Sequence, residues 1–489
     1  MVHEDEDNGT DIPEGIFSLL DTDLYKLTMQ CAVLKYFPQT EVSYAFTNRT
    51  PNMKLTREAF VWLQRQIDKL ANVYVSDSEI EWLRKECEYL GPEYLRYLTT
   101  LRLKPSEQVE LKFTSQDGSD TGDLSMSIKG LWVDTILYEI PLLALTSEAY
   151  FKFCDTDWDH EGQVQKAYEK GRTLLQEGCL LSEFGSRRRR DYKTHDLIMK
   201  GLCQASQEAK VAGWTGKFAG TSNVHFANKY GVAPVGTVAH EWYMGIAAIT
   251  DDYEHANEKA LSYWLGCFGE GVLGIALTDT FGTPDFFKSF KMPIPRTTLA
   301  SAEAGAVAPS TVSGTTQAGP GSPAETLPPV QAQLDADFSK KDFKSYAQVF
   351  TGVRQDSGDP KDYVKMARQF YDSVGIKEKK VIVFSDSLNT ERCIEYKKVA
   401  EENGFIPSFG VGTFFTNDFV RKSDGKKSIP LNIVIKISYA GGRPAVKISD
   451  NIGKNTGDEK TVEDVKRRLG YIEKAWHEGN EATRWGSGK

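Results

Sequence analysis

The sequence is poor in cysteine, has no long apolar run and carries no excess of positive charge. Its 489 residues include seven cysteines, and no two of them form a CxxC pair. An odd number of isolated cysteines argues against a disulfide framework or a structural zinc site, so a reducing compartment is expected. Asp134 and Glu139 interrupt the longest candidate membrane span, around residues 131–145. We therefore expect no membrane segment.

The charge balance bears on possible partners. Lys and Arg total 59 and Asp and Glu total 68, giving a net charge of −9. This argues against a protein held on nucleic acid mainly by bulk positive charge, although a local nest of donors could still bind a small anion. The first fifteen residues are acidic and contain no apolar stretch, so no signal peptide is expected. The expected location is the cytoplasm, with the nucleus as a second compartment.

One internal segment differs in composition from the rest of the chain. Residues 301–330 contain six Ala, five Pro and four each of Ser, Thr and Gly. Such a segment cannot bury enough apolar surface to offset the entropy lost on ordering. We predict that residues 293–337 form a disordered low-complexity insertion within one domain.

The patterns on either side of residue 150 predict two domains. The first 150 residues mix helical periodicity with alternating strand patterns, which indicates an α+β domain of sandwich-like form, completed by C-terminal segments from about 431–489. Residues 151–430 alternate short apolar runs with helical patterns, which predicts parallel strands in an irregular α/β barrel. The expected strands cover residues 180–187, 217–223, 235–240, 273–281, 350–359, 381–389 and 408–418, and 431–439 could add another.

Polar residues follow almost every one of these runs. The reacting groups of an α/β barrel sit where its strands end, so these side chains should converge on one rim. SFGVGTFFTND and VIVFSDSLN combine small residues with hydroxyl donors, as a phosphate site requires. A tight structural turn and a capped helix start are the respective alternatives.

Two further patterns suggest specific chemistry. In VRQDSGDP, Arg354 suits a carboxylate or phosphate, and Asp356 and Asp359 could take up Mg²⁺ or bind sugar hydroxyls. The alternative is an Arg–Asp ion pair that only braces a turn. His240 in GTVAHEW is a potential nucleophile, but taken alone a buried structural histidine is the better interpretation. Glu241 cannot be assumed to orient it. The run Arg187–Arg190 could be a nucleic-acid patch, but no second basic cluster supports it.

Taken together, the segments resemble the nicotinate phosphoribosyltransferase family. DTDLYKLTMQ, SEFGSRRRR, GTSNVHFANKYGVAPVGTVAHEW, LTDTFGT, VRQDSGDP, SDSLN and FGVGTFFTND occur in the family's order, over about residues 17–455. The resemblance implies that nicotinate attacks C1 of phosphoribosyl pyrophosphate, coupled to ATP hydrolysis, giving nicotinate mononucleotide and pyrophosphate. The partners it implies are these small molecules, with Mg²⁺ as cofactor and a homodimer as one possible assembly; no nucleic acid and no membrane are expected.

The resemblance also implies roles for individual residues. His240 would be phosphorylated by ATP, and Asp279 would act with it. Tyr25 and Phe184 would enclose the pyridine ring, and Arg354 and Thr237 would hold its carboxylate. Other expected contacts to the anionic substrates, ribose and metal are Arg187, Asp279, Asp356, Ser357, Gly358, Ser385, Asp386, Gly410, Gly412 and Thr413, with Asp279 and Asp356 as metal ligands. Lys447 and Lys454 would meet phosphates or be plain solvated lysines.

Two other functions compete with this one. A nicotinamide phosphoribosyltransferase would need an acidic or amide partner for its neutral ring substituent, whereas Arg354 and Thr237 favour a carboxylate. A non-enzymatic RNA-binding protein would use Arg187–Arg190, against a net charge of −9.

Overall fold

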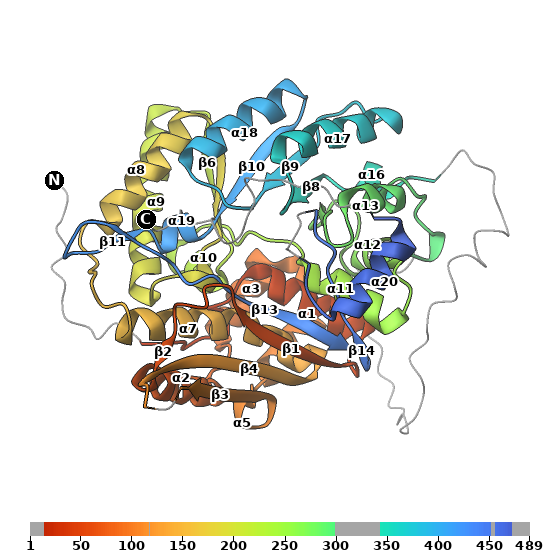
Figure 1. The fold of residues 1–489 in the computed structure, drawn as a ribbon. Helices are drawn as coiled ribbons and strands as arrows, with labels where there is room; N and C mark the ends of the chain where they lie inside the picture. Colours follow the sequence, from red (N-terminus) through yellow and green to blue (C-terminus); the bar gives the residue numbers. More distant parts are fainter. Residues whose placement is uncertain (1–13, 117, 299–342, 451–454, 472–489) are drawn as a thin grey trace.

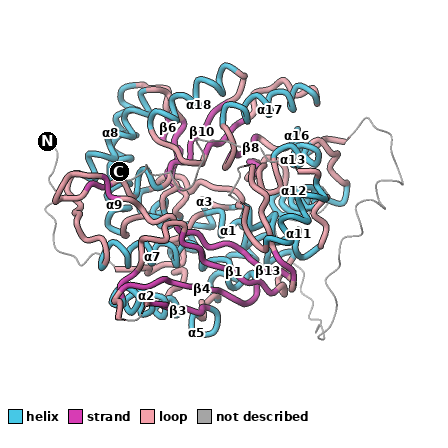
Figure 2. The backbone as a smooth tube through the Cα atoms, viewed as in Figure 1, coloured by secondary structure: helices cyan, strands magenta, loops and turns pink. Residues whose placement is uncertain are grey.

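Two sheets of six strands organise the computed structural model, which describes residues 14–116, 118–298, 343–450 and 455–471. Figure 1 shows the antiparallel sheet in the lower half of the view and the parallel sheet, with its covering helices, in the upper half. Figure 2 shows the strands of each sheet grouped together, with helices packed around and between them. No helix within the described ranges has both the length and the apolar character needed to cross a membrane.

The antiparallel sheet combines the two ends of the chain. Its order is β14-β13-β1-β4-β2, with β3 also paired to β4. The strands are β1 (Glu41–Asn48), β2 (Leu55–Thr56), β3 (Val109–Ser115), β4 (Thr121–Leu131), β13 (Ile433–Ala440) and β14 (Arg443–Pro444). The prediction that residues 431–439 extend the parallel series is therefore wrong. Helices α7 and α11 contact β13, which gives it the apolar character of a buried parallel strand.

The helices of the N-terminal region begin where the sequence supplies caps. Ser76 and Glu79 form a reciprocal capping box at the start of α3, and the Thr56 hydroxyl accepts from the Ala59 amide at the start of α2. The helices are α1 (Leu24–Tyr36), α2 (Arg57–Lys69), α3 (Asp77–Glu86), α4 (Gly91–Thr100), α5 (Pro105–Gln108), α6 (Trp132–Thr135) and α7 (Glu139–Phe153).

The parallel sheet confirms the predicted α/β class. Its order is β6-β5-β10-β9-β8-β7, from β5 (Leu180–Glu183), β6 (Lys217–Thr221), β7 (Ile275–Leu277), β8 (Gly352–Gln355), β9 (Val381–Phe384) and β10 (Ile406–Val411). The expected strand at residues 235–240 does not form. Pro234 makes a single bridge to Thr221, and His240 already begins a helix. Proline lacks an amide donor, so a regular ladder cannot continue through it.

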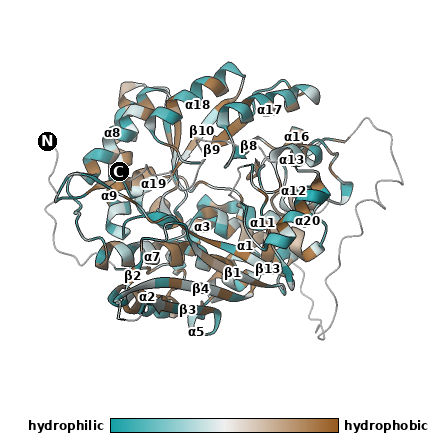
Figure 3. Ribbon diagram, viewed as in Figure 1, coloured by the Kyte–Doolittle hydropathy of each residue, from teal (hydrophilic) through white to brown (hydrophobic). Residues whose placement is uncertain are grey.

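Helices surround the parallel sheet. Along α17 the buried residues Tyr363, Val364, Ala367 and Tyr371 recur at helical spacing, and Figure 3 shows both hydrophilic and hydrophobic residues on this helix. The helices are α8 (Gln163–Gln176), α9 (Tyr192–Ala212), α10 (Val224–Tyr230), α11 (His240–Thr250), α12 (Ala256–Phe268), α13 (Thr283–Phe290), α16 (Tyr346–Val349), α17 (Pro360–Ser373), α18 (Thr390–Glu402), α19 (Thr413–Thr416) and α20 (Glu459–Leu469). The predicted insertion, residues 293–337, lies outside the described residues except for 293–298.

Candidate active site

A cavity lies at the carboxyl ends of the parallel strands, where the sequence predicted the polar rim. Strands β5, β8, β9 and β10 lead into it, and α1, α7 and β13 close it from the side of the antiparallel sheet. Most of the predicted site residues line it, namely Tyr25, Phe184, Arg187, Thr237, His240, Arg354, Asp356, Ser385, Gly410, Gly412 and Thr413. Asp279, Ser357, Gly358 and Asp386 do not line this cavity; Asp279 stands behind His240, and Ser357 and Gly358 border a second cavity.

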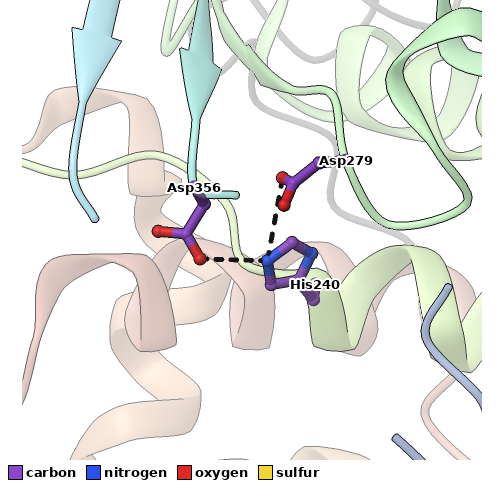
Figure 4. A group of neighbouring side chains, drawn as sticks. All are labelled: His240, Asp279 and Asp356. Carbon is purple, nitrogen blue, oxygen red and sulfur yellow. Dashed lines mark hydrogen bonds and ion pairs between the residues drawn. The ribbon is translucent and has the colours of Figure 1, made fainter. Parts of the chain in front are cut away.

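His240 is held between a hydroxyl on one side and charged groups on the other. Its Nδ1 lies 2.9 Å from Thr280 Oγ1, and its Nε2 lies 2.9 Å from Lys447 Nζ. Figure 4 shows the carboxylates of Asp356 and Asp279 facing the same ring, at 3.2 Å and 3.9 Å from Nε2. His240 is the first residue of α11 rather than the end of a strand. Because an ammonium can only donate, Lys447 donates to Nε2, which leaves the ring proton on Nδ1.

The surroundings keep this imidazole neutral. Burial, together with the ammonium of Lys447, lowers the pKa of His240 to about 4. Burial opposes ionisation of the neighbouring carboxyls, but Lys447 holds the pKa of Asp279 below its ordinary value and Arg354 holds that of Asp356 well below. At neutral pH the cluster therefore combines two carboxylates with an unprotonated nitrogen.

The two carboxylates fit the predicted magnesium ion. A ligand atom from each of His240, Asp279 and Asp356 lies within 4.8 Å of the others. The buried Oδ1 of Asp279 accepts no hydrogen bond from the described residues. Mg²⁺ prefers oxygen ligands, so Asp279 and Asp356 could hold it and the imidazole is the less suitable partner. Lys447 Nζ lies 3.5 Å from Asp279 Oδ2, so its ammonium would compete with Mg²⁺ for the negative charge of this carboxylate.

Arg354 is fixed by its neighbours at the cavity wall. Its Nε donates to Ser385 Oγ at 2.8 Å and its Nη2 to Asp356 Oδ1 at 3.0 Å. The predicted Arg–Asp pair is thus present, and Ser385 links both of its members to the end of β9. The same guanidinium still lines the cavity, so bracing and anion binding are compatible.

The glycine at position 410 is explained by the ring of Phe184. A Cβ atom on Gly410 would lie 2.2 Å from two ring carbons of Phe184, so the ring rests directly on the backbone of β10. Tyr25 enters the same cavity from the second residue of α1. Two aromatic residues from distant segments thus line one cavity.

Several residues of the cavity were missed in the sequence. Glu139 lies 2.5 Å from Lys26 and 3.8 Å from Arg187, and Lys436 enters from β13. Burial, with nearby cations, lowers the pKa of Lys436 to about 8. Lys436 is the single charged residue in the apolar run NIVIKISY, and that contrast could have indicated it. Lys447, to which the sequence gave two equal interpretations, is in contact with His240.

Glu241 and the arginine run have structural partners. Glu241 accepts from Tyr44 Oη at 2.6 Å and Trp132 Nε1 at 2.8 Å, and it pairs with Lys26. Its bonds thus go to residues other than His240. Arg188, Arg189 and Arg190 are buried, and Arg189 binds Asp21 through two hydrogen bonds of 2.7 Å. A buried run cannot present a basic face to RNA, which removes the feature behind that alternative.

Two family models match most of the chain. The model of the nicotinate phosphoribosyltransferase N-terminal domain matches residues 20–147, and that of the nicotinate phosphoribosyltransferase family matches residues 179–301 and 324–473. The unmatched residues between the last two ranges fall inside the predicted insertion.

Individual relatives match along nearly their whole length. The nicotinate phosphoribosyltransferase of Saccharomyces cerevisiae is 44% identical over 96% of this chain and 99% of its own, and that of Methanosarcina mazei is 38% identical over 94% and 98%. Among solved structures, a nicotinate phosphoribosyltransferase from Saccharomyces cerevisiae superposes with a TM-score of 0.81 at 43% identity, covering 94% of this chain and all of that one. The enzyme from Porphyromonas gingivalis superposes with a TM-score of 0.75 at 30% identity, covering 93% and 100%. The chain therefore belongs to the nicotinate phosphoribosyltransferase family of enzymes.

Proposed function

We propose that the chain transfers the phosphoribosyl group of phosphoribosyl pyrophosphate to nicotinate, coupled to ATP hydrolysis through a phosphohistidine at position 240. The pyridine nitrogen attacks C1 of the ribose, the bond from C1 to the pyrophosphate oxygen breaks, and nicotinate mononucleotide and pyrophosphate leave. The nucleophile needs no strong base, so the protein mainly positions the reactants and stabilises charge.

The cavity walls match the two substrates in kind. The ring of nicotinate would lie between Tyr25 and Phe184, with its carboxylate toward Arg354 and Thr237. The hydroxyl of Ser385 and the turn from Gly410 to Thr413 would hold the 5-phosphate and ribose, with Asp386 nearby in the chain. Arg187 would contact the anionic groups. Mg²⁺, held by Asp279 and Asp356, would supply positive charge against the pyrophosphate.

The environment of His240 carries the ATP-coupled part of the proposal. Its Nε2 is unprotonated and lies 2.9 Å from the ammonium of Lys447, and the residue lines the cavity. Attack of this nitrogen on the γ-phosphorus of ATP forms a P–N bond and breaks the bond to the bridging oxygen, releasing ADP. Lys447 can follow the transferred phosphoryl group, and Thr280 Oγ1 accepts a hydrogen bond from Nδ1–H throughout. Water later attacks the phosphorus, which breaks the P–N bond, releases inorganic phosphate and restores the neutral imidazole.

The substrate pair tests the reaction. We expect turnover of nicotinate with phosphoribosyl pyrophosphate, faster with ATP than without it, and little turnover of nicotinamide. Product formation is followed by chromatography, and mass spectrometry of the protein after incubation with ATP should place the phosphate on His240. Equal use of nicotinate and nicotinamide would overturn the proposed specificity for nicotinate.

The pH dependence of phosphorylation should reflect the lowered pKa of His240. An imidazole with the ordinary pKa near 6.5 would lose about tenfold of its neutral form by pH 5.5, whereas a pKa of about 4 leaves it almost fully neutral. We expect the rate of labelling by γ-labelled ATP to stay level from pH 7.5 to 5.5. Lys447→Met removes the nearby cation and should raise the pKa of His240. The labelling rate of this variant should therefore begin to fall at a higher pH than that of the wild type. A wild-type rate that halves near pH 6.5 would contradict this assignment.

The proposal also covers the compartment in which the enzyme works and its oligomeric state. We place the enzyme in the cytoplasm, with the nucleus as a second compartment, because its isolated cysteines suit a reducing environment. A homodimer is the assembly to test, by sedimentation of the full chain.

A further inference from the structure

A buried carboxylate immediately precedes Phe184 in the chain and lies outside the cavity. Glu183 is the last residue of β5, and its side chain and that of His195 on α9 are both 0% exposed. Glu183 does not line the cavity, whereas its neighbours Ser182, Phe184 and Gly185 do. The reaction proposed above makes no use of this pair.

Three elements donate hydrogen bonds to this one carboxylate. Oε2 accepts from Thr221 Oγ1 of β6 at 2.6 Å and lies 2.9 Å from His195 Nε2. Oε1 accepts from the backbone N–H of Gly185, a bond that closes a turn over Phe184. Burial opposes ionisation, but His195 holds the pKa of Glu183 below its ordinary value, so the bonds to a charged oxygen are of the stronger kind.

The same turn is fixed from its other side. Thr416 Oγ1 donates to the carbonyl of Gly185 at 2.9 Å, and the N–H of Phe184 donates to Val411 at 2.8 Å. A Cβ on Gly185 would lie 2.3 Å from Thr416 and 2.6 Å from Glu183 Oε1, so the turn is packed too closely for any side chain at this position. The ring that rests on Gly410 is thereby held in one place.

We propose that Glu183, anchored by His195 and Thr221, is a positioning residue that sets the Phe184 ring for the substrate's pyridine ring. This rests on the proposed function, which puts nicotinate against Phe184. The carboxylate acts through the Gly185 N–H and touches no substrate. Without it the turn over Phe184 loses its closing bond, and the ring samples other rotamers.

A double-mutant cycle tests the link, with KM for nicotinate measured at saturating phosphoribosyl pyrophosphate and ATP. We expect Glu183→Ala and Phe184→Ala each to raise KM by about tenfold, and the double variant also by about tenfold rather than about a hundredfold, because both act through one ring. Glu183→Gln keeps an acceptor for Gly185 and should recover most of the affinity. His225→Gln is the control and should leave KM within about twofold, because His225 Nε2 pairs with Tyr192 Oη at 3.0 Å and the residue does not line the cavity.

The outcomes separate this inference from the reaction it rests on. A hundredfold rise in the double variant, or equal rises in KM for all three substrates, would overturn the positioning role. If Glu183→Ala does not fold, Thr221→Val can be used instead, because it removes one hydrogen-bond donor to Glu183 without changing the side chain's shape. A threefold rise in KM for nicotinate that is absent when Phe184→Ala is also present supports the positioning role. A rise in KM that remains in the Phe184→Ala background overturns it. An unchanged KM in Phe184→Ala would overturn the ring site itself, and this inference with it.

Discussion

Replacing His240 with asparagine should lower the rates of acid-labile protein phosphorylation and of ATP hydrolysis by about 10³-fold or more. Some ATP-independent transferase activity should survive. Asparagine can keep a hydrogen bond to Thr280 but offers no nucleophilic ring nitrogen. The measurements are labelling by γ-labelled ATP, release of ADP, and formation of nicotinate mononucleotide with and without ATP.

A matched variant guards this result against a general loss of structure. His255 is exposed and pairs with Asp252 on the surface, so His255→Asn should leave labelling unchanged. If His240→Asn protein still became phosphorylated, another residue would be the acceptor, and the role proposed for His240 would be wrong.

Removing the guanidinium at position 354 should have the second largest effect. Arg354→Ala deletes a charged donor for the substrate carboxylate, worth about 1.5–3 kcal/mol, so KM for nicotinate should rise by about 10- to 150-fold. The ratio of KM for nicotinamide to KM for nicotinate should fall by a similar factor, because the neutral amide has no negative charge to pair with the guanidinium. Steady-state kinetics with both substrates measure this.

The same change also alters the chemistry beside His240. Arg354 donates to Asp356 at 3.0 Å, and without it the pKa of Asp356 should rise toward its ordinary value. Arg172→Ala is the control, because this arginine is half-exposed and pairs with Glu208 at the surface. An unchanged nicotinate KM in Arg354→Ala would place the carboxylate elsewhere.

The parts of the site that short local sequence patterns mark could be predicted from the sequence. A buried strand followed by small and polar residues indicates a strand end at the rim, and this identified Arg354, Asp356, Ser385 and Gly410 together. It also predicted the α/β class from the alternation of runs and helices. Such signals span fewer than about ten residues, so a single sequence carries them.

Contacts between distant segments could not be predicted in the same way. The hydrogen bond between Lys447 and His240 joins positions 207 residues apart, and the local sequence around neither residue indicates this contact. Local apolar character misassigned residues 431–439, because covering helices make an antiparallel strand look like a buried parallel one. Pro234 is the local signal against a regular strand at residues 235–240, because it has no amide hydrogen to donate to a ladder.

The pairing of β13 with β1 has a consequence for the order in which the protein is made. Ser438 donates to the carbonyl of Ser43 across 395 positions, so β1 leaves the ribosome long before its neighbour exists. Until then one edge of the N-terminal sheet has no strand to pair with, and the cavity lacks Lys436 and the ammonium of Lys447. Such long-range closure is slow, and an open edge invites association with other chains. A nascent chain that has completed every parallel strand, through Val411, therefore still lacks the strand that pairs with β1 and the lysine that contacts His240.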